Sequence, residues 1–152
     1  LVGSEMCIRD SVFIAYASVY GNTRKAADML ASKLADKGVH VTVSDLARDD
    51  WAECLEDAFR YGKLVLAAPT YNADVFPAMK EFINHLTERN YQNRTIGIIE
   101  NGSWAPMAAK VMKGMFEKSK NITFAENTVT VRSAVNAANE AQIEALAEEL
   151  KG

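Results

Sequence analysis

The sequence has few cysteines, no apolar run long enough to cross a membrane, and no excess of positive charge. Only two of its 152 residues are cysteines, Cys7 and Cys54, so we expect neither a disulfide framework nor a cysteine metal cluster. No apolar run approaches the roughly 20 residues that cross a bilayer. The net charge of −3 leaves no basic stripe for nucleic acid. We therefore expect no membrane and no nucleic-acid partner, and a cytoplasmic location.

The usual phosphate-binding motifs are also missing. The chain lacks the lysine-containing loop of nucleoside triphosphatases and the three spaced glycines of dinucleotide-binding folds. Instead, the buried apolar run 12–17 leads into Ser18-Val-Tyr-Gly-Asn-Thr23 and then a helical pattern. Hydroxyls, backbone N–H groups at a helix N-terminus and a glycine together hold a phosphate monoester without lysine. The alternative interpretation is an ordinary strand-to-helix turn capped by Asn22 or Thr23.

The first eleven residues differ from the rest of the chain. They show no strand or helix periodicity and join the first predicted strand without a linker. Residues 5–10 are similar to a translated sequencing-library adaptor; a short native tail and an expression scar are the alternatives. We expect residues 1–11 to be a non-native or disordered tail, excluded from the fold. Residues 12–152 then form one domain, because this length fits a single core.

Short apolar runs alternate with amphipathic segments over residues 12–152, which is typical of βαβ units. The expected strands are 12–17, 39–44, 64–68, 95–100 and 128–131. The third and fourth are continuous apolar runs, so we expect them at the centre of a sheet covered on both faces. Five helices are expected: one ending at Gly38, one over 51–61, and three starting at Pro77, Pro106 and Asn139.

The segments after the first, third and fourth strands indicate a ligand site. In a doubly wound sheet the ligand crevice lies at the carboxyl ends of the strands. Tyr71 follows the third strand and Trp104 follows the fourth. Two aromatic rings beside a phosphate cradle suit a ligand with a phosphate and a flat ring system, each stack adding about 0.5–1.5 kcal/mol. The alternative is that both aromatic residues only pack.

Three segments of the sequence resemble flavodoxins, and more closely the FMN-binding domain of flavodiiron proteins. They are Tyr16–Thr23, Leu64–Asn72 and Gly97–Pro106, within a match from Val12 to about Leu150. The resemblance implies an α/β fold with a flavodoxin-like, doubly wound, five-stranded parallel sheet in strand order 2-1-3-4-5 and helices on both faces. It also implies FMN as the cofactor and electron transfer as the role.

The resemblance further implies which residues hold FMN. Ser18, Tyr20, Gly21, Asn22 and Thr23 would wrap the phosphate; Pro69, Thr70, Tyr71 and Asn72 would flank one side of the ring; Asn101, Gly102, Ser103 and Trp104 would line the other. No catalytic side chain and no metal ligand is expected. Ala73-Asp74 stands where related domains often carry glycine, which disfavours a redox-coupled peptide flip. Asp74 either lowers the flavin potential or caps the helix entered at Pro77.

Three functions are consistent with these residues. The first is the C-terminal domain of a flavodiiron protein, which takes electrons from rubredoxin or an NAD(P)H-linked reductase. A diiron domain, in the same chain or a second subunit, then reduces oxygen or nitric oxide, which this domain alone is not expected to do. The second is a free-standing flavodoxin acting as a mobile carrier. The third, a receiver-type signalling domain, needs acidic residues where this chain has Ala17-Ser18 and Ala68-Pro69.

Overall fold

The computed structural model describes residues 11–17, 21–71, 74–102, 107–132 and 135–151. The strands are β1 (Val12–Tyr16), β2 (Val41–Asp45), β3 (Lys63–Tyr71), β4 (Asp74–Val75), β5 (Arg94–Asn101), β6 (Ile122–Phe124) and β7 (Val129–Val131). The helices are α2 (Asn22–Asp36), α3 (Trp51–Arg60), α4 (Pro77–Glu88), α5 (Ala108–Met115) and α6 (Ala137–Leu150). Strands and helices alternate along the described chain, as the sequence predicts.

The sheet follows the path β2-β1-β3-β5-β6, and every pair on this path is parallel. β6 pairs with the first residues of β5, and β7 pairs in parallel with its last residues, Ile99–Asn101. Counting β6 and β7 as one interrupted strand gives the predicted order 2-1-3-4-5. The short β4 forms an antiparallel hairpin with the end of β3.

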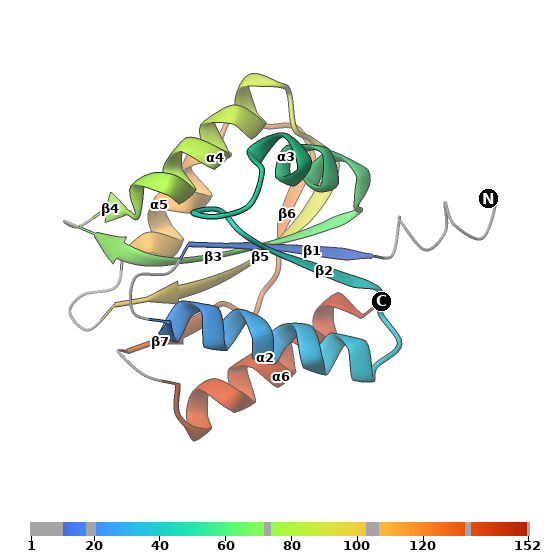
Figure 1. Ribbon diagram of the computed structural model, residues 1–152, viewed down its shortest axis with the longest axis vertical. Coiled ribbons are helices and arrows are strands. Elements are labelled where there is room, and N and C mark those ends of the chain that lie inside the picture. The colour runs from blue at the N-terminus through green and yellow to red at the C-terminus, as the bar shows by residue number, and fades with distance from the viewer. Residues whose placement is uncertain (1–10, 18–20, 72–73, 103–106, 133–134, 152) are drawn as a thin grey trace.

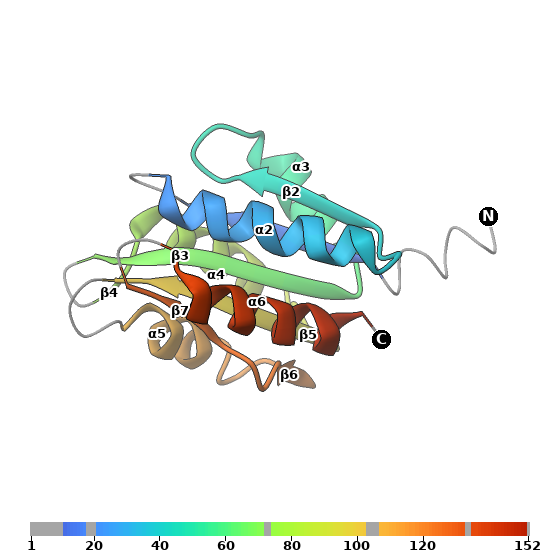
Figure 2. The same ribbon diagram turned by 90° about the horizontal axis from the view of Figure 1, so that it is seen from below.

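Helices cover both faces of the sheet, because the central strands are apolar on both sides. In β3, Leu64, Leu66 and Ala68 pack toward the side of α3, α4 and α5, whereas Val65 and Ala67 pack toward α2 and α6. Figure 1 shows these two helical layers above and below the sheet, and Figure 2 shows α2 and α6 side by side on one face. The side-chain alternation of β3 therefore assigns each helix to a layer.

The start of the last helix differs from the sequence prediction. The last helix begins at Ala137, not at Asn139, because Asn136 is its N-cap and forms a capping box with Asn139. The backbone of Asp74 lies in β4, and the N-cap position of α4 is occupied by Phe76. Gly38 does follow the end of α2, with φ of +82°, as predicted.

The fifth strand is also more complex than expected. The sequence predicts a strand over 128–131, and β7 confirms it, but β6 was not predicted. β6 has only three residues, and Phe124 and Ile122 are half-buried, so its apolar pattern is too short to stand out. Glu149 of α6 accepts hydrogen bonds from the backbone N–H groups of Glu126 and Asn127, at 2.7 and 3.1 Å. Ala125 N still donates to the Ile96 carbonyl of β5 at 2.8 Å, so the chain between β6 and β7 is held by β5 at Ala125 and by α6 at Glu126 and Asn127.

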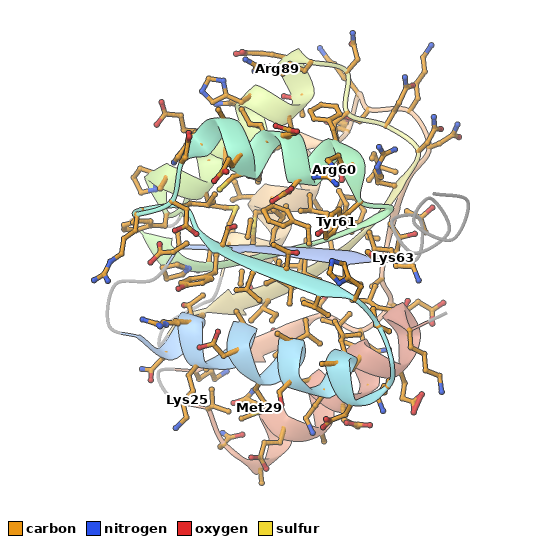
Figure 3. The ribbon with its side chains drawn as sticks, turned by 45° about the vertical axis from the view of Figure 1, so that its right-hand side comes forward. Lys25, Met29, Arg60, Tyr61, Lys63 and Arg89 are labelled. Carbon is orange, nitrogen blue, oxygen red and sulfur yellow. The ribbon has the colours of Figure 1, made fainter. Side chains whose placement is uncertain are left out.

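Side chains close the amino edge of the sheet. The hydroxyl of Tyr61 lies 2.6 Å from Thr42 Oγ1 and 3.2 Å from His40 Nε2, and Lys63 Nζ donates to the Leu150 carbonyl at 2.7 Å (Figure 3). These contacts join β2, β3 and α6 at the edge where β3 begins. His40 therefore has a structural partner.

Candidate functional site

The predicted site residues that the structure describes meet at one edge of the sheet. β1, β3, β5 and β7 end there, and α2 and α5 begin there, on the left of Figure 1. This edge brings together Gly21, Asn22, Thr23, Pro69, Thr70, Asn101 and Gly102, and the backbone of Tyr71 at the end of β3. Ser18, Tyr20, Asn72, Ala73, Ser103 and Trp104 lie outside the described residues.

The N-terminus of α2 has the features of an anion site. Its N-cap is Gly21, with φ of +86°, and Asn22 and Thr23 are the first two residues of the helix, so capping by Asn22 or Thr23 is wrong. The first turn carries no acidic residue, and Thr23 is only 2% exposed. The first N–H groups of this helix and its dipole therefore face the crevice without a competing carboxylate of their own turn. This chemistry fits the phosphate of FMN.

Asn101 connects the end of β5 to this helix. Its Nδ2 donates to Thr23 Oγ1 at 3.4 Å, which places both side chains on the α2 face of the sheet. The strand register sets Asn101 beside Pro69 of β3 and Val131 of β7. Gly102 N donates to the Val131 carbonyl at 3.0 Å, which fixes the chain where it leaves β5. The phosphate side and the ring side of the predicted site are thus joined.

The N-terminus of α5 lies at the same edge but is already occupied by side chains. Thr70 Oγ1 accepts from the N–H groups of Met107 at 3.0 Å and Ala108 at 3.2 Å. Glu100 Oε1 accepts from the N–H of Ala109 at 3.0 Å. Three donors of α5 are therefore used by the protein. An added anion is better accommodated at α2 than at α5.

Glu100 was not predicted as a site residue. It is 8% exposed, and its second oxygen, Oε2, accepts from the hydroxyl of Thr130 at 2.8 Å. Its carboxylate thus links β5, β7 and α5 directly below the crevice. One sequence signal was available: Glu100 is a charged residue that directly follows the apolar run 96–99. A charge in that place is expected to be paired or hydrogen-bonded.

A small cavity of about 300 Å³ adjoins the crevice on the side of β2. Its walls include Tyr16 at the end of β1, Arg24 and Asp28 on α2, and Asp45 and Arg48 at the end of β2. Burial, and then the Asp45 carboxylate, raises the pKa of Tyr16 above its usual value. Arg24 is exposed and lies 3.7 Å from Asp28, while Lys25 points away from the sheet (Figure 3).

A second cavity, of about 720 Å³, lies at the opposite edge of the sheet. It is lined by residues that follow α4, such as Asn90 and Gln92, and by residues that follow α5, such as Lys118 and Lys120. It is therefore separate from the predicted flavin crevice. Within the described part of the chain, His, Cys, Asp and Glu side chains form no group of three that could hold a metal ion. No helix of that part is long and apolar enough to cross a membrane.

Comparison with known proteins supports a flavin-binding fold. The chain is 30% identical over 89 residues to a coenzyme F420H2 oxidase of Methanothermobacter marburgensis, which covers 59% of this chain and 22% of that protein. The rubredoxin oxygen:oxidoreductase of Desulfovibrio gigas superposes with a TM-score of 0.87 at 20% identity, over 93% of this chain and 35% of that one. A flavodoxin from the domain Archaea superposes with a TM-score of 0.82 at 15% identity, over 93% and 96%.

The similar proteins differ in how much of their own length this chain covers. The chain spans only about a fifth of the length of the curated oxidase that it matches, and about a third of the D. gigas chain. It has nearly the whole length of the archaeal flavodoxin. Both structural likenesses show the shared fold. The family model of the flavodoxin domain matches residues 13–137, and on that match the chain belongs to the flavodoxin domain family.

Proposed function

We propose that this chain binds FMN by its phosphate and transfers electrons as the flavodoxin domain of a flavodiiron protein. One observation carries the FMN proposal: the first turn of α5 is filled by Thr70 and Glu100, whereas the N-cap of α2 is a glycine and its first turn carries no acidic residue. A phosphate at α2 gains helix N–H donors and the positive end of the dipole. The family membership supports a flavin as the ligand.

The chain's own residues would bind and orient the cofactor. In this proposal Ser18, Tyr20, Gly21, Asn22 and Thr23 enclose the phosphate; Pro69, Thr70, Tyr71 and Asn72 form one wall of the ring site; Asn101, Gly102, Ser103 and Trp104 form the other. Bound FMN supplies the electron-carrying chemistry. The Thr70 hydroxyl acts through the backbone of Met107 and Ala108, so it positions the segment that follows Gly102.

Two observations favour the flavodiiron assignment. The curated relative is an oxidase several times longer than the matched region, and the D. gigas structure is named as a rubredoxin oxygen:oxidoreductase. Residues 12–152 would then be the FMN domain, rubredoxin or an NAD(P)H-linked reductase the electron donor, and a diiron domain the acceptor. The alternative, a free-standing flavodoxin, is supported by the nearly complete coverage of the archaeal flavodoxin.

FMN and riboflavin distinguish a phosphate-binding site from a simple aromatic pocket. We expect the protein to quench FMN fluorescence on binding and to bind riboflavin about 100-fold more weakly, because two charge-assisted hydrogen bonds of about 1.5 kcal/mol each supply that factor. Inorganic phosphate should compete with FMN and leave riboflavin binding unchanged. Equal affinity for FMN and riboflavin would contradict the phosphate site.

The choice between a flavodiiron domain and a free-standing flavodoxin needs a different experiment. The genomic DNA upstream of the Val12 codon can be recovered and sequenced. An in-frame domain with His, Glu and Asp metal ligands would support the flavodiiron assignment. A start codon immediately before β1 would favour a free flavodoxin, and it would leave the FMN proposal intact.

A further inference from the structure

A buried carboxylate lies directly under the proposed ring site. Glu100 is the penultimate residue of β5, and its side chain faces the α5 side of the sheet, while that of Asn101 reaches Thr23 on the α2 side. The register places Glu100 between Ala68 of β3 and Thr130 of β7. It is thus within one residue of the segment 101–104 that we propose as one wall of the ring site.

The hydrogen bonds of Glu100 are those of an ionised carboxylate. Each oxygen accepts one bond, Oε1 from Ala109 N at 3.0 Å and Oε2 from Thr130 Oγ1 at 2.8 Å. The first turn of a helix favours a negative charge at this position. No Lys or Arg among residues 11–17, 21–71, 74–102, 107–132 and 135–151 forms an ion pair with it. Within this part of the chain, hydrogen-bond donors solvate the carboxylate and no cation neutralises it.

We propose that Glu100 makes this site bind oxidised FMN more tightly, relative to reduced FMN, than a neutral residue would. The inference rests on the proposed FMN site. Reduction of the flavin by two electrons with uptake of one proton leaves one additional negative charge on the ring. A buried carboxylate repels that charge through a medium of low dielectric constant. Glu100 also positions α5 through Ala109, but this second effect acts on both redox forms alike.

The test is Glu100→Gln, with dithionite as the two-electron reductant and midpoint potential as the readout. Glutamine keeps the volume, can accept from Ala109 N and can donate to Thr130 Oγ1, so mainly the charge is removed. We expect the ratio of affinities, reduced over oxidised FMN, to rise about three- to tenfold. A tenfold rise equals a potential about 30 mV higher for a two-electron couple.

Two control variants separate charge from structure. Glu117→Gln removes an exposed carboxylate after the other end of α5 and should leave the ratio within twofold of the wild type. Thr130→Val removes one hydrogen bond of Glu100 but keeps the charge, so it should change both affinities together. If Glu100→Gln does not fold, Glu100→Met is the second neutral variant of similar size.

The outcomes for Glu100 and for the FMN site are distinguishable. If the wild type binds no FMN, the proposed function is wrong and the role of Glu100 is wrong with it. If FMN binds but Glu100→Gln leaves the ratio unchanged, lowers both affinities equally, or shifts the ratio no more than Glu117→Gln, only the inference about Glu100 is overturned. A shift confined to the Glu100 variants confirms it.

Discussion

Gly21 and Gly38 lie at the two ends of α2 and share a left-handed backbone, with φ of +86° and +82°. An added Cβ at either position would meet no atom of the described residues within 4 Å, so we expect conformation to decide the cost of a side chain. We expect Gly21→Ala and Gly38→Ala each to lower the free energy of unfolding by about 1–2 kcal/mol, measured by chemical denaturation.

The two variants should differ in ligand binding. Gly21 begins the proposed phosphate site, so Gly21→Ala should weaken FMN at least about fivefold, since the backbone must shift to relieve the strain. Gly38 lies at the other end of α2, so Gly38→Ala should bind FMN as the wild type does. Equal FMN affinity in both variants, measured by fluorescence titration, would place the phosphate elsewhere.

The roles of individual residues were harder to predict than their places. Thr70 was expected to flank the ring, and its hydroxyl is bonded to the N–H groups of Met107 and Ala108, 37 and 38 positions away in the chain. No local pattern contains a contact over such a distance. Glu100 was missed for the same reason, because its partners come from α5 and β7.

At the scale of elements, one side chain of α6 bonds to the backbone at the interruption between β6 and β7. Glu149 accepts from Glu126 N at 2.7 Å, and from Asn127 N at 3.1 Å and Asn127 Nδ2 at 2.9 Å. Burial opposes its charge, but these hydrogen bonds outweigh burial and lower the pKa of Glu149 below its usual value. Its contribution is therefore present above the ordinary carboxyl pKa and is lost as the pH falls.

Glu149→Ala should free the segment between β6 and β7. Because the lost acceptor is exposed and water can replace it, we expect a loss of roughly 1 kcal/mol in the free energy of unfolding at neutral pH. Hydrogen exchange should become faster at the amides of Glu126 and Asn127. Glu126→Ala removes a neighbouring carboxylate that makes no hydrogen bond with the described residues, and it is the control. Unchanged exchange at both amides in Glu149→Ala would contradict this role.

At the scale of the whole molecule, the sequence alone predicted a central sheet covered by helices on both faces. The long apolar runs of β3 and β5 and the amphipathic stripes of the helices depend on burial alone, and burial follows from residue type. The short β6 depends on its pairing with β5, so it was not predicted. The capping box was predicted three residues too late, because Asn139 with Gln142 fits the usual capping-box pattern better than Asn136 with Asn139. The contact between Thr23 and Asn101 was not predicted; only their place at the same edge of the sheet was expected from the alternation of strands and helices.

The two helices of one layer are joined by a cluster of opposite charges. Lys37 Nζ lies 2.6 Å from Glu144 and 3.2 Å from Glu148, Lys33 lies 3.2 Å from Glu144, and Lys151 lies 2.7 Å from Glu148. Hydrogen bonds from Lys37 and then Lys33 lower the pKa of Glu144, and those from Lys151 and then Lys37 lower the pKa of Glu148, both below the usual 4.5. The cluster joins α2 to α6 (Figure 2).

These pKa shifts predict how the stability of the whole domain depends on pH. A carboxyl group whose pKa is lower in the folded than in the unfolded protein stabilises the fold above its unfolded pKa. The free energy of unfolding should therefore fall as the pH decreases from about 5 toward 3. The pKa of Lys37 is raised, chiefly by its hydrogen bond to Glu144. Its contribution is complete below the usual lysine pKa of 10.5 and is lost only at higher pH.

The double variant Glu144→Gln/Glu148→Gln isolates this cluster from the other carboxylates. Its urea midpoint should be lower than that of the wild type at pH 7, and the difference should shrink toward pH 3, where the wild-type carboxylates are protonated too. Each of the five side chains in the cluster is partly exposed to solvent, so 1 M salt should reduce the difference at pH 7 by screening. A difference that is constant from pH 7 to pH 3 would mean that packing of the side-chain stems, and not charge, joins α2 to α6.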